Sequence, residues 1–252
     1  MTCACDIAAR LDALNNIIIP EEFRKLTIHD FNGNDRNGVP ILSTKVAAQA
    51  KSKLIQYCWG DVTANKLQSM NLAARVAASK LADRFEDGRN VVIHGGSSKT
   101  IKKDTDGKTI VKSKPKGKTF MASILTREAI LLSSNPKWQR LTYDWVNFAT
   151  LLHELKEQPE EASSYLFADW LVIDNIGESY ATSASKAQKL LHSGLLDPFF
   201  YQRMKNKLPT LMVCKFDVDA RSTELEEAFG DAFSTLIESP KTMKICLTES
   251  DG

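Results

Sequence analysis

Short apolar runs alternate with longer amphipathic segments along most of this chain. The longer segments repeat their apolar residues every three or four positions, which is typical of helices. A strand, a crossover helix and the next strand in succession favour a parallel sheet that is covered on both faces. The pattern therefore predicts a three-layer α/β domain with a five-stranded, mainly parallel sheet. The five strands are expected at Val91–Ile93, Leu141–Tyr143, Trp170–Ile173, Thr210–Val213 and Met243–Leu247.

Helical patterns fill the spaces between these runs and precede the first of them. One apolar stripe within them is expected to pack on the sheet, and it consists of Trp145, Phe148, Leu151, Leu152 and Leu155. We interpret residues 1–43 as a short helical lead-in or linker, a remnant of a partner-binding module, and residues 44–252 as the main domain. The predicted helices are Val46–Trp59, Ala64–Phe85, Phe120–Leu132, Trp145–Glu157, Ser183–Lys205 and Thr223–Glu238.

Charge and cysteine content indicate the cellular location of the protein but do not identify a binding partner. The 33 basic and 31 acidic residues nearly cancel, so only local clusters could indicate a polyanionic ligand. No apolar run approaches the roughly 18 residues of a membrane span, and the N-terminus lacks the layout of a secretory signal. The five cysteines are unevenly spread, which does not resemble a disulfide framework. A cytoplasmic protein is expected.

The cysteines and histidines of this sequence do not have the spacing that is typical of metal sites. Cys3 and Cys5 form a lone C-x-C pair, whereas structural zinc sites need four ligands. Zinc is therefore not expected. The four histidines show no ligand spacing, and His94 is interpreted as a structural residue beside a loop.

Two Gly-Lys-Thr triplets, at 107–109 and 117–119, suggest a phosphate-binding loop, but neither has the first glycine of the usual motif at its normal offset. Such a loop must join a buried strand to a helix N-terminus, where backbone N–H groups and the helix dipole converge on the anion. Only the second triplet precedes a helical pattern, and only Gly95 and Gly96 follow a strand. We therefore predict a loop in two parts. Its residues are Gly95, Gly96, Ser97, Gly117, Lys118, Thr119 and Phe120.

The segment between the two parts, at about 99–114, has the pattern of a β-hairpin. Asp106-Gly107 is a strong two-residue turn signal between two short strand-like runs. We predict an exposed basic hairpin inserted into the phosphate loop. Its charge either contacts the phosphates of single-stranded DNA or keeps a solvated hairpin soluble. The lysines concerned are Lys99, Lys102, Lys103, Lys108, Lys112 and Lys114.

An aspartate at the end of the third predicted strand supplies the second part of a nucleotide site. Asp174 follows the apolar run Trp170–Ile173, about 55 residues after Thr119. In P-loop enzymes an aspartate in this position holds Mg²⁺ opposite the loop hydroxyl. The alternative is that Asp174 only caps a turn. With the phosphate loop upstream, we favour a Mg²⁺ site formed by Thr119 and Asp174.

Taken together, these features resemble the DnaC-type replicative-helicase loaders, with the IstB transposition helpers as close relatives, within the AAA+ ATPases. The likeness extends over most of the chain. It includes the lead-in from Ile19 to Phe31, the run Phe167–Gly177 as a Walker B strand, and the stretch from Phe200 to Thr210. The resemblance implies an AAA+ P-loop domain of the ASCE type. The sequence leaves no room for the C-terminal helical lid domain of many AAA+ proteins, as is typical of these loaders.

The resemblance also implies roles for individual residues. Lys118 would bind the β- and γ-phosphates of ATP or ADP, and Thr119 with Asp174 would hold Mg²⁺. Arg203 falls where the family places an arginine finger, which would imply self-assembly; the alternative is a surface arginine on a long helix. The implied partners are a hexameric replicative helicase and single-stranded DNA in a bacterial or phage-infected cell, with no membrane.

Two positions in the catalytic part of the site depart from the family pattern. Asn175 stands where an acidic residue orients the attacking water, and an amide cannot act as that base. Lys215 stands where the family has a polar sensor residue. The sequence thus leaves three functions open: a helicase loader with weak ATP turnover, an adaptor with a degenerate nucleotide site, and an IstB-like transposition helper.

Overall fold

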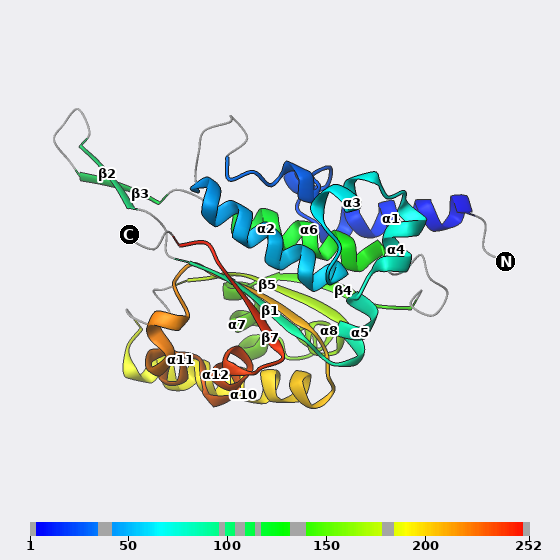
Figure 1. Ribbon diagram of the computed structural model, residues 1–252. Helices are drawn as coiled ribbons and strands as arrows, with labels where there is room; N and C mark the ends of the chain where they lie inside the picture. The colour runs from blue at the N-terminus through cyan, green and yellow to red at the C-terminus, as the bar shows by residue number, and fades with distance from the viewer. Residues whose placement is uncertain are drawn as a thin grey trace.

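The structure is a computed structural model that describes residues 4–34, 42–95, 99–103, 109–113, 117–131, 140–177 and 184–248. Its centre is a five-stranded sheet in the order β4-β5-β6-β1-β7, and every pairing between neighbours is parallel. This confirms the predicted α/β fold with a parallel sheet (Figure 1). The strands are β1 (Asn90–His94), β4 (Tyr143–Asn147), β5 (Trp170–Ile176), β6 (Thr210–Cys214) and β7 (Thr242–Cys246).

Helices cover both faces of this sheet and bury two separate hydrophobic clusters. In β1 the side chains alternate, so that Val91 and Ile93 join one cluster and Val92 joins the other. The first face is covered by the N-terminal half of the chain and by the helix that follows the hairpin (Figure 1). Its helices are α1 (Ala4–Ile18), α2 (Thr44–Trp59), α3 (Ala64–Ser69), α4 (Leu72–Ala78), α5 (Leu81–Glu86) and α6 (Lys118–Leu131).

The second face is covered by helices from the C-terminal half, and it carries an aromatic cluster. Phe229 lies at the centre of that cluster, with ring centroids 5.6 Å from Phe148 and 4.8 Å from Phe233. Aromatic pairs at this separation stabilise a core beyond the area that they bury. The helices are α7 (Phe148–Glu157), α8 (Ser163–Phe167), α10 (Lys186–Lys205), α11 (Ser222–Phe229) and α12 (Asp231–Glu238).

Several boundaries differ from those expected from the sequence. The predicted helix Ala64–Phe85 is three short helices, because Met70 and Ser79 have an extended backbone conformation. Asn71 caps the start of the second of these helices. The predicted helix Thr223–Glu238 is two helices, because Gly230 has a φ of 96°. Local patterns alone did not reveal these breaks.

Strand β4 begins and ends later than predicted, and this changes the interpretation of one apolar stripe. Trp145 lies in β4 and packs against the first cluster, whereas Phe148, Leu151 and Leu152 of α7 are buried in the second. The expected five-residue helical stripe is therefore wrong at Trp145. The remaining residues do pack on the sheet, with Leu155 partly buried against the same cluster.

The lead-in before residue 44 is packed against the domain. Leu11, Ile19, Ile28 and Phe31 are buried in the same cluster as residues of α2 and α6. A capping box between Thr27 and Asp30 closes a short 3-10 turn (Ile28–Asp30) and fixes the path of this segment. Another 3-10 turn, Glu21–Phe23, precedes it.

The inserted segment contains β2 (Lys99–Lys103) and β3 (Thr109–Ser113), which pair as an antiparallel ribbon with Ile101 opposite Val111. The turn signal Asp106-Gly107 lies outside the described residues. The ribbon extends away from the sheet near the N-terminal end of α2 (Figure 1). Among the described residues, none of the helices has the length and apolar character that crossing a membrane requires.

Candidate functional site

The first part of the predicted loop begins where β1 ends. Gly95 donates its backbone N–H to the carbonyl of Phe216 at 3.0 Å, which holds it beside the segment after β6. Its φ is 138°, and a Cβ there would lie 2.9 Å from the carbonyl carbon of Leu247. Only glycine fits both the conformation and the space. Gly96 and Ser97 lie outside the described residues.

The second part of the loop begins α6. Gly117 has a φ of 70°, and its carbonyl accepts the N–H of Met121 at 2.9 Å, as expected at a helix N-terminus. Lys118, the next residue, is 9% exposed. Its Nζ donates a hydrogen bond of 3.0 Å to the carbonyl oxygen of Gly95. Two segments separated by the hairpin thus meet in space.

Asp174 of β5 completes this cluster. The hydroxyl of Thr119 donates to Asp174 Oδ1 at 3.4 Å, and Asp174 as a whole is 8% exposed. Burial raises the pKa of Asp174, and this rise is opposed by hydrogen bonds from the Asn175 N–H and the Thr119 hydroxyl and by the charges of Lys215 and Lys118. Added positive charge at the site would favour the ionised carboxylate further.

The Thr119 and Asp174 oxygens fit a small divalent cation. Carboxylate and hydroxyl oxygens are hard ligands, and adjacent ligands of Mg²⁺ are about 2.9 Å apart when each bond is about 2.0–2.1 Å. The 3.4 Å separation of the two oxygens is close to that value. Lys118 and the N-terminus of α6 provide positive charge next to the carboxylate, as binding of a metal–phosphate complex requires.

Asn175 has an unusual backbone conformation next to Asp174. Its φ is 66°, and the pairing of β5 with β6 shifts register between Ile173 and Ile176. The bulge lets the Asn175 N–H donate to Asp174 Oδ1 at 2.7 Å. Asparagine and aspartate tolerate this conformation better than most residues. The position would therefore accept either an amide or a carboxylate without new strain.

Lys215 lies across the β5–β6 edge from the carboxylate. Its backbone N–H donates to the carbonyl of Ile176 at 2.8 Å, and its side chain is exposed. Its charge lowers the pKa of Asp174, which places it within electrostatic range of the site. Glu178, another acidic residue near this point of the sequence, lies outside the described residues.

Phe120 packs against the lead-in. Its ring stacks on Phe23 with centroids 6.0 Å apart and lies 5.7 Å from the ring of Phe31. The guanidinium of Arg127, further along α6, donates to the carbonyl of Leu26 at 3.0 Å. The lead-in is therefore fastened to the helix that carries Lys118 and Thr119.

Arg203 is the clearest disagreement with the sequence-based interpretation. Its side chain is fully buried at 0% exposure, so it is neither an arginine finger nor a surface arginine. It donates to Thr210 Oγ1 at 2.9 Å and to main-chain carbonyls, and it joins the end of α8 to the start of β6. A side chain held this way cannot reach a neighbouring subunit, so the prediction of an arginine finger is wrong. The carbonyls are those of Tyr165, Leu166, Ala168, Leu208 and Pro209.

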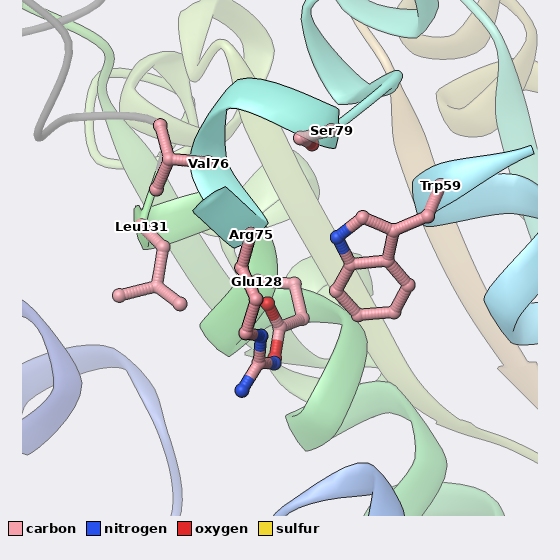
Figure 2. A pocket seen from close by; sticks show the side chains of 6 residues that line it. All are labelled: Trp59, Arg75, Val76, Ser79, Glu128 and Leu131. Carbon is pink, nitrogen blue, oxygen red and sulfur yellow. The ribbon is translucent and has the colours of Figure 1, made fainter. Parts of the chain in front are cut away.

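A pocket on the first face contains a buried ion pair that the sequence did not reveal. Arg75 of α4 pairs with Glu128 of α6, and the guanidinium lies 5.4 Å from the ring centroid of Trp59 (Figure 2). The pocket is also lined by Val76, Ser79 and Leu131. Burial raises the pKa of Glu128, and the charge and hydrogen bond of Arg75 oppose this. The pocket lies towards the C-terminal end of α6, away from Lys118, so we do not assign the nucleotide to it.

Comparison with known proteins supports the fold. No family model matches this sequence, and no curated protein matches it. Two solved structures are similar over nearly the full chain. A primosome component from Streptococcus pyogenes serotype M3 has a TM-score of 0.52 and 13% identity, covering 93% of this chain and 94% of that one. DnaI has a TM-score of 0.51 and 15% identity, covering 96% and 98% respectively. At these identities the comparison establishes that the α/β fold is shared with these proteins, and nothing finer.

Proposed function

We propose that this protein is an AAA+ ATPase of DNA replication that binds ATP with Mg²⁺ and assists the loading of a hexameric helicase onto single-stranded DNA. The observation that carries the nucleotide part is the meeting of Gly95, Lys118, Thr119 and Asp174 at the carboxyl ends of β1 and β5. In open α/β sheets, ligands bind at this edge.

Lys118 contacts the β- and γ-phosphates in this proposal. On binding, its ammonium would exchange the Gly95 carbonyl for phosphate oxygens, which offer a charged acceptor and hence stronger hydrogen bonds. Thr119 and Asp174 would hold Mg²⁺, and the bound ion would neutralise charge on the phosphates. The N-terminus of α6 would contribute its dipole to the same anion.

Hydrolysis is proposed to be slow. The position after Asp174 carries Asn175, whose amide cannot accept a proton from the attacking water. Nucleotide would then act mainly as a switch or an assembly ligand. This is the observation that keeps an adaptor with a degenerate nucleotide site as the second candidate function.

The replication role is supported by two independent resemblances. The sequence resembles the DnaC-type loaders at the lead-in, the Walker B strand and the stretch before β6. The fold is similar to those of a primosome component and of DnaI. An IstB-like role in transposition would use the same nucleotide site and differ only in the partner.

The nucleotide proposal is tested by titrating the protein with fluorescent ATP and ADP, with and without Mg²⁺. We expect binding that Lys118→Ala weakens at least tenfold. Lys66→Ala, which removes an exposed lysine of α3, is the matched control and should bind normally. Failure of the wild-type protein to bind either nucleotide would leave the adaptor as the better description.

The second part of the proposal is that the inserted ribbon binds single-stranded DNA. Lysine contacts to phosphate make the affinity fall with salt, with a slope of about 0.7 per contact for single strands. We expect replacement of the ribbon lysines by glutamine to weaken binding and to flatten this slope. The control replaces an equal number of exposed lysines elsewhere and should leave the slope unchanged. The ribbon lysines are Lys99, Lys102, Lys103 and Lys112, and the control lysines are Lys25, Lys66, Lys80 and Lys156.

The partner is tested by co-purification with a replicative helicase and, in parallel, with a transposase from the same genetic element. The proposal expects a stoichiometric complex with the helicase and stimulated loading onto a single-stranded circle. Selective binding of the transposase would instead support the IstB-like function.

A further inference from the structure

A second cluster of potential ligands lies on the opposite face of the sheet from α6. His94 ends β1 and is directly opposite Cys246 of β7 in the parallel register. The neighbouring residues Ile93 and Ile245 point into the first hydrophobic cluster. Because side chains alternate along a strand, His94 and Cys246 point together to the other face, beneath the segment that leads from β6 to α11.

That segment contributes a carboxylate. Asp217 Oδ1 lies 3.3 Å from His94 Nδ1, and the His94 side chain is 0% exposed. Nδ1 accepts the backbone N–H of Val218 at 3.4 Å, so it is the unprotonated nitrogen, and a metal ion would replace this long hydrogen bond. One ligand atom from each of His94, Asp217 and Cys246 lies within 4.8 Å of the others. A nitrogen, an oxygen and a sulfur donor therefore converge, from three different parts of the chain, on one small volume.

We propose that His94, Asp217 and Cys246 bind one divalent transition-metal ion, with Zn²⁺ as the preferred metal. Zn²⁺ accepts all three donor types, and a tetrahedral site places ligand atoms about 3.3–3.8 Å apart. The His94–Asp217 pair already has this separation. All pairs lie within 4.8 Å, so no pair needs to approach by more than about 1.3 Å to meet the bond lengths of zinc. A water molecule would supply the fourth ligand from the half-exposed side of Asp217.

The other nitrogen of His94 is placed as in many zinc sites. Nε2 is buried without a hydrogen-bond partner and lies 3.7 Å from Asp219 Oδ2. A metal-bound histidine normally donates its second N–H to a carboxylate, which fixes the ring and makes it a better ligand. Asp219 is in turn held by Lys244, whose Nζ lies 2.6 Å from Oδ1. A slight shift of Asp219 would satisfy the buried Nε2–H.

The charges around the cluster suit a dication. A bound metal would be neutralised by the Asp217 carboxylate and the Cys246 thiolate, while Lys244 is already paired with Asp219. The His94 side chain is 0% exposed, and the neutral imidazole is the form that coordinates metals. The ion would join β1, β7 and the β6–α11 segment one residue before Gly95, next to the nucleotide site.

The test uses the full-length protein with Cys3→Ser and Cys5→Ser, so that the N-terminal cysteine pair cannot bind the probe. The metal-free protein is titrated with Co²⁺, which takes zinc positions and shows a near-ultraviolet charge-transfer band when bound by a thiolate. We expect one equivalent to bind with this band and to be displaced by Zn²⁺. Cys246→Ser should abolish the band and weaken binding at least about 100-fold, since loss of an outer-shell partner alone weakens a site about 10–100-fold.

Asp217→Asn provides a second arm that does not depend on a buried residue. It should keep the thiolate band but weaken Co²⁺ binding and remove the rise in melting temperature that Zn²⁺ produces in the parent protein. Asp61→Asn, at an exposed site, is the control and should behave like the parent. Absence of stoichiometric binding by the folded parent, or a band that persists in Cys246→Ser, would overturn the proposal.

Discussion

Lys118 Nζ donates a hydrogen bond of 3.0 Å to the carbonyl oxygen of Gly95, across an interruption of more than twenty residues in the sequence. The bond joins the end of β1 to the start of α6, which are the two elements that a phosphate-binding loop connects. The paired strands β2 and β3 lie between them and extend away from the sheet (Figure 1). The insertion therefore leaves the junction of strand and helix in place.

Deletion of residues 99–114 should leave the fold intact. The ends of the insertion are already held together by the contact between Gly95 and Lys118, and the ribbon extends away from the sheet (Figure 1). We expect a cooperative thermal transition within a few degrees of the wild-type value, by circular dichroism, and retained ATP binding. An unfolded or aggregated product would show that the ribbon is part of the domain and would contradict its interpretation as an insertion.

Asn175→Asp should raise the steady-state ATPase rate by about tenfold or more, since a positioned general base contributes about 10²–10⁴-fold. The change should not strain the backbone, because aspartate tolerates a φ of 66° as asparagine does. The rate is measured by phosphate release at saturating ATP. Asn175→Gly, which accepts the same φ but lacks a carboxylate, is the control, and an equal rate in both variants would exclude a catalytic effect of the carboxylate.

The sequence predicted the sheet well because buried parallel strands are continuous apolar runs between helices. It placed β4 too early, because Trp145 and Val146 fit a helical stripe as well as a strand. It also missed the breaks at Met70, Ser79 and Gly230, where backbone conformation interrupts an otherwise regular helical pattern. Periodicity reports which residues are apolar, and it carries little information about where a turn falls between them.

The sequence could predict which residues lie close together where the neighbouring strand and helix pattern decides their position. It could not do so where packing between distant parts of the chain decides it. Gly95 follows β1, Asp174 lies near the end of β5 and Lys118 begins α6, so topology alone brings them together. Arg203 has the same local pattern whether it faces solvent or a ring of carbonyls. His94 and Cys246 are 152 positions apart in sequence, and only the register of β1 with β7 makes them neighbours.

Arg203→Met should act on stability and not on subunit assembly. The variant leaves the carbonyls of Tyr165 and Ala168 without their donor, and each buried unsatisfied group costs about 1–3 kcal/mol. We expect a loss of about 3 kcal/mol or more in the free energy of unfolding, measured by urea denaturation. Lys205→Met, an exposed change in the same helical turn, should have little effect. A stable Arg203→Met protein with impaired assembly would restore the arginine-finger interpretation.

Arg75→Met should destabilise the first face in a pH-dependent manner. Removal of one partner of a buried ion pair costs about 3–5 kcal/mol because the remaining charge is uncompensated, and Glu128 is only 6% exposed. Arg89→Met is the control, since its partner Asp87 is 56% exposed and exposed pairs contribute about 0–1 kcal/mol.

The sign of the pH effect follows from the raised pKa of Glu128. A carboxyl group whose pKa is higher in the folded than in the unfolded protein stabilises the fold fully below its unfolded pKa, and this contribution is lost as pH rises through the folded pKa. Loss of Arg75 raises the folded pKa further, because its charge and hydrogen bond lower it in the wild type. The stability difference between wild type and Arg75→Met should therefore be larger at about pH 8 than at about pH 5. Urea denaturation at both values measures it, and a difference that stays constant or grows towards acid would show that Glu128 does not carry the effect.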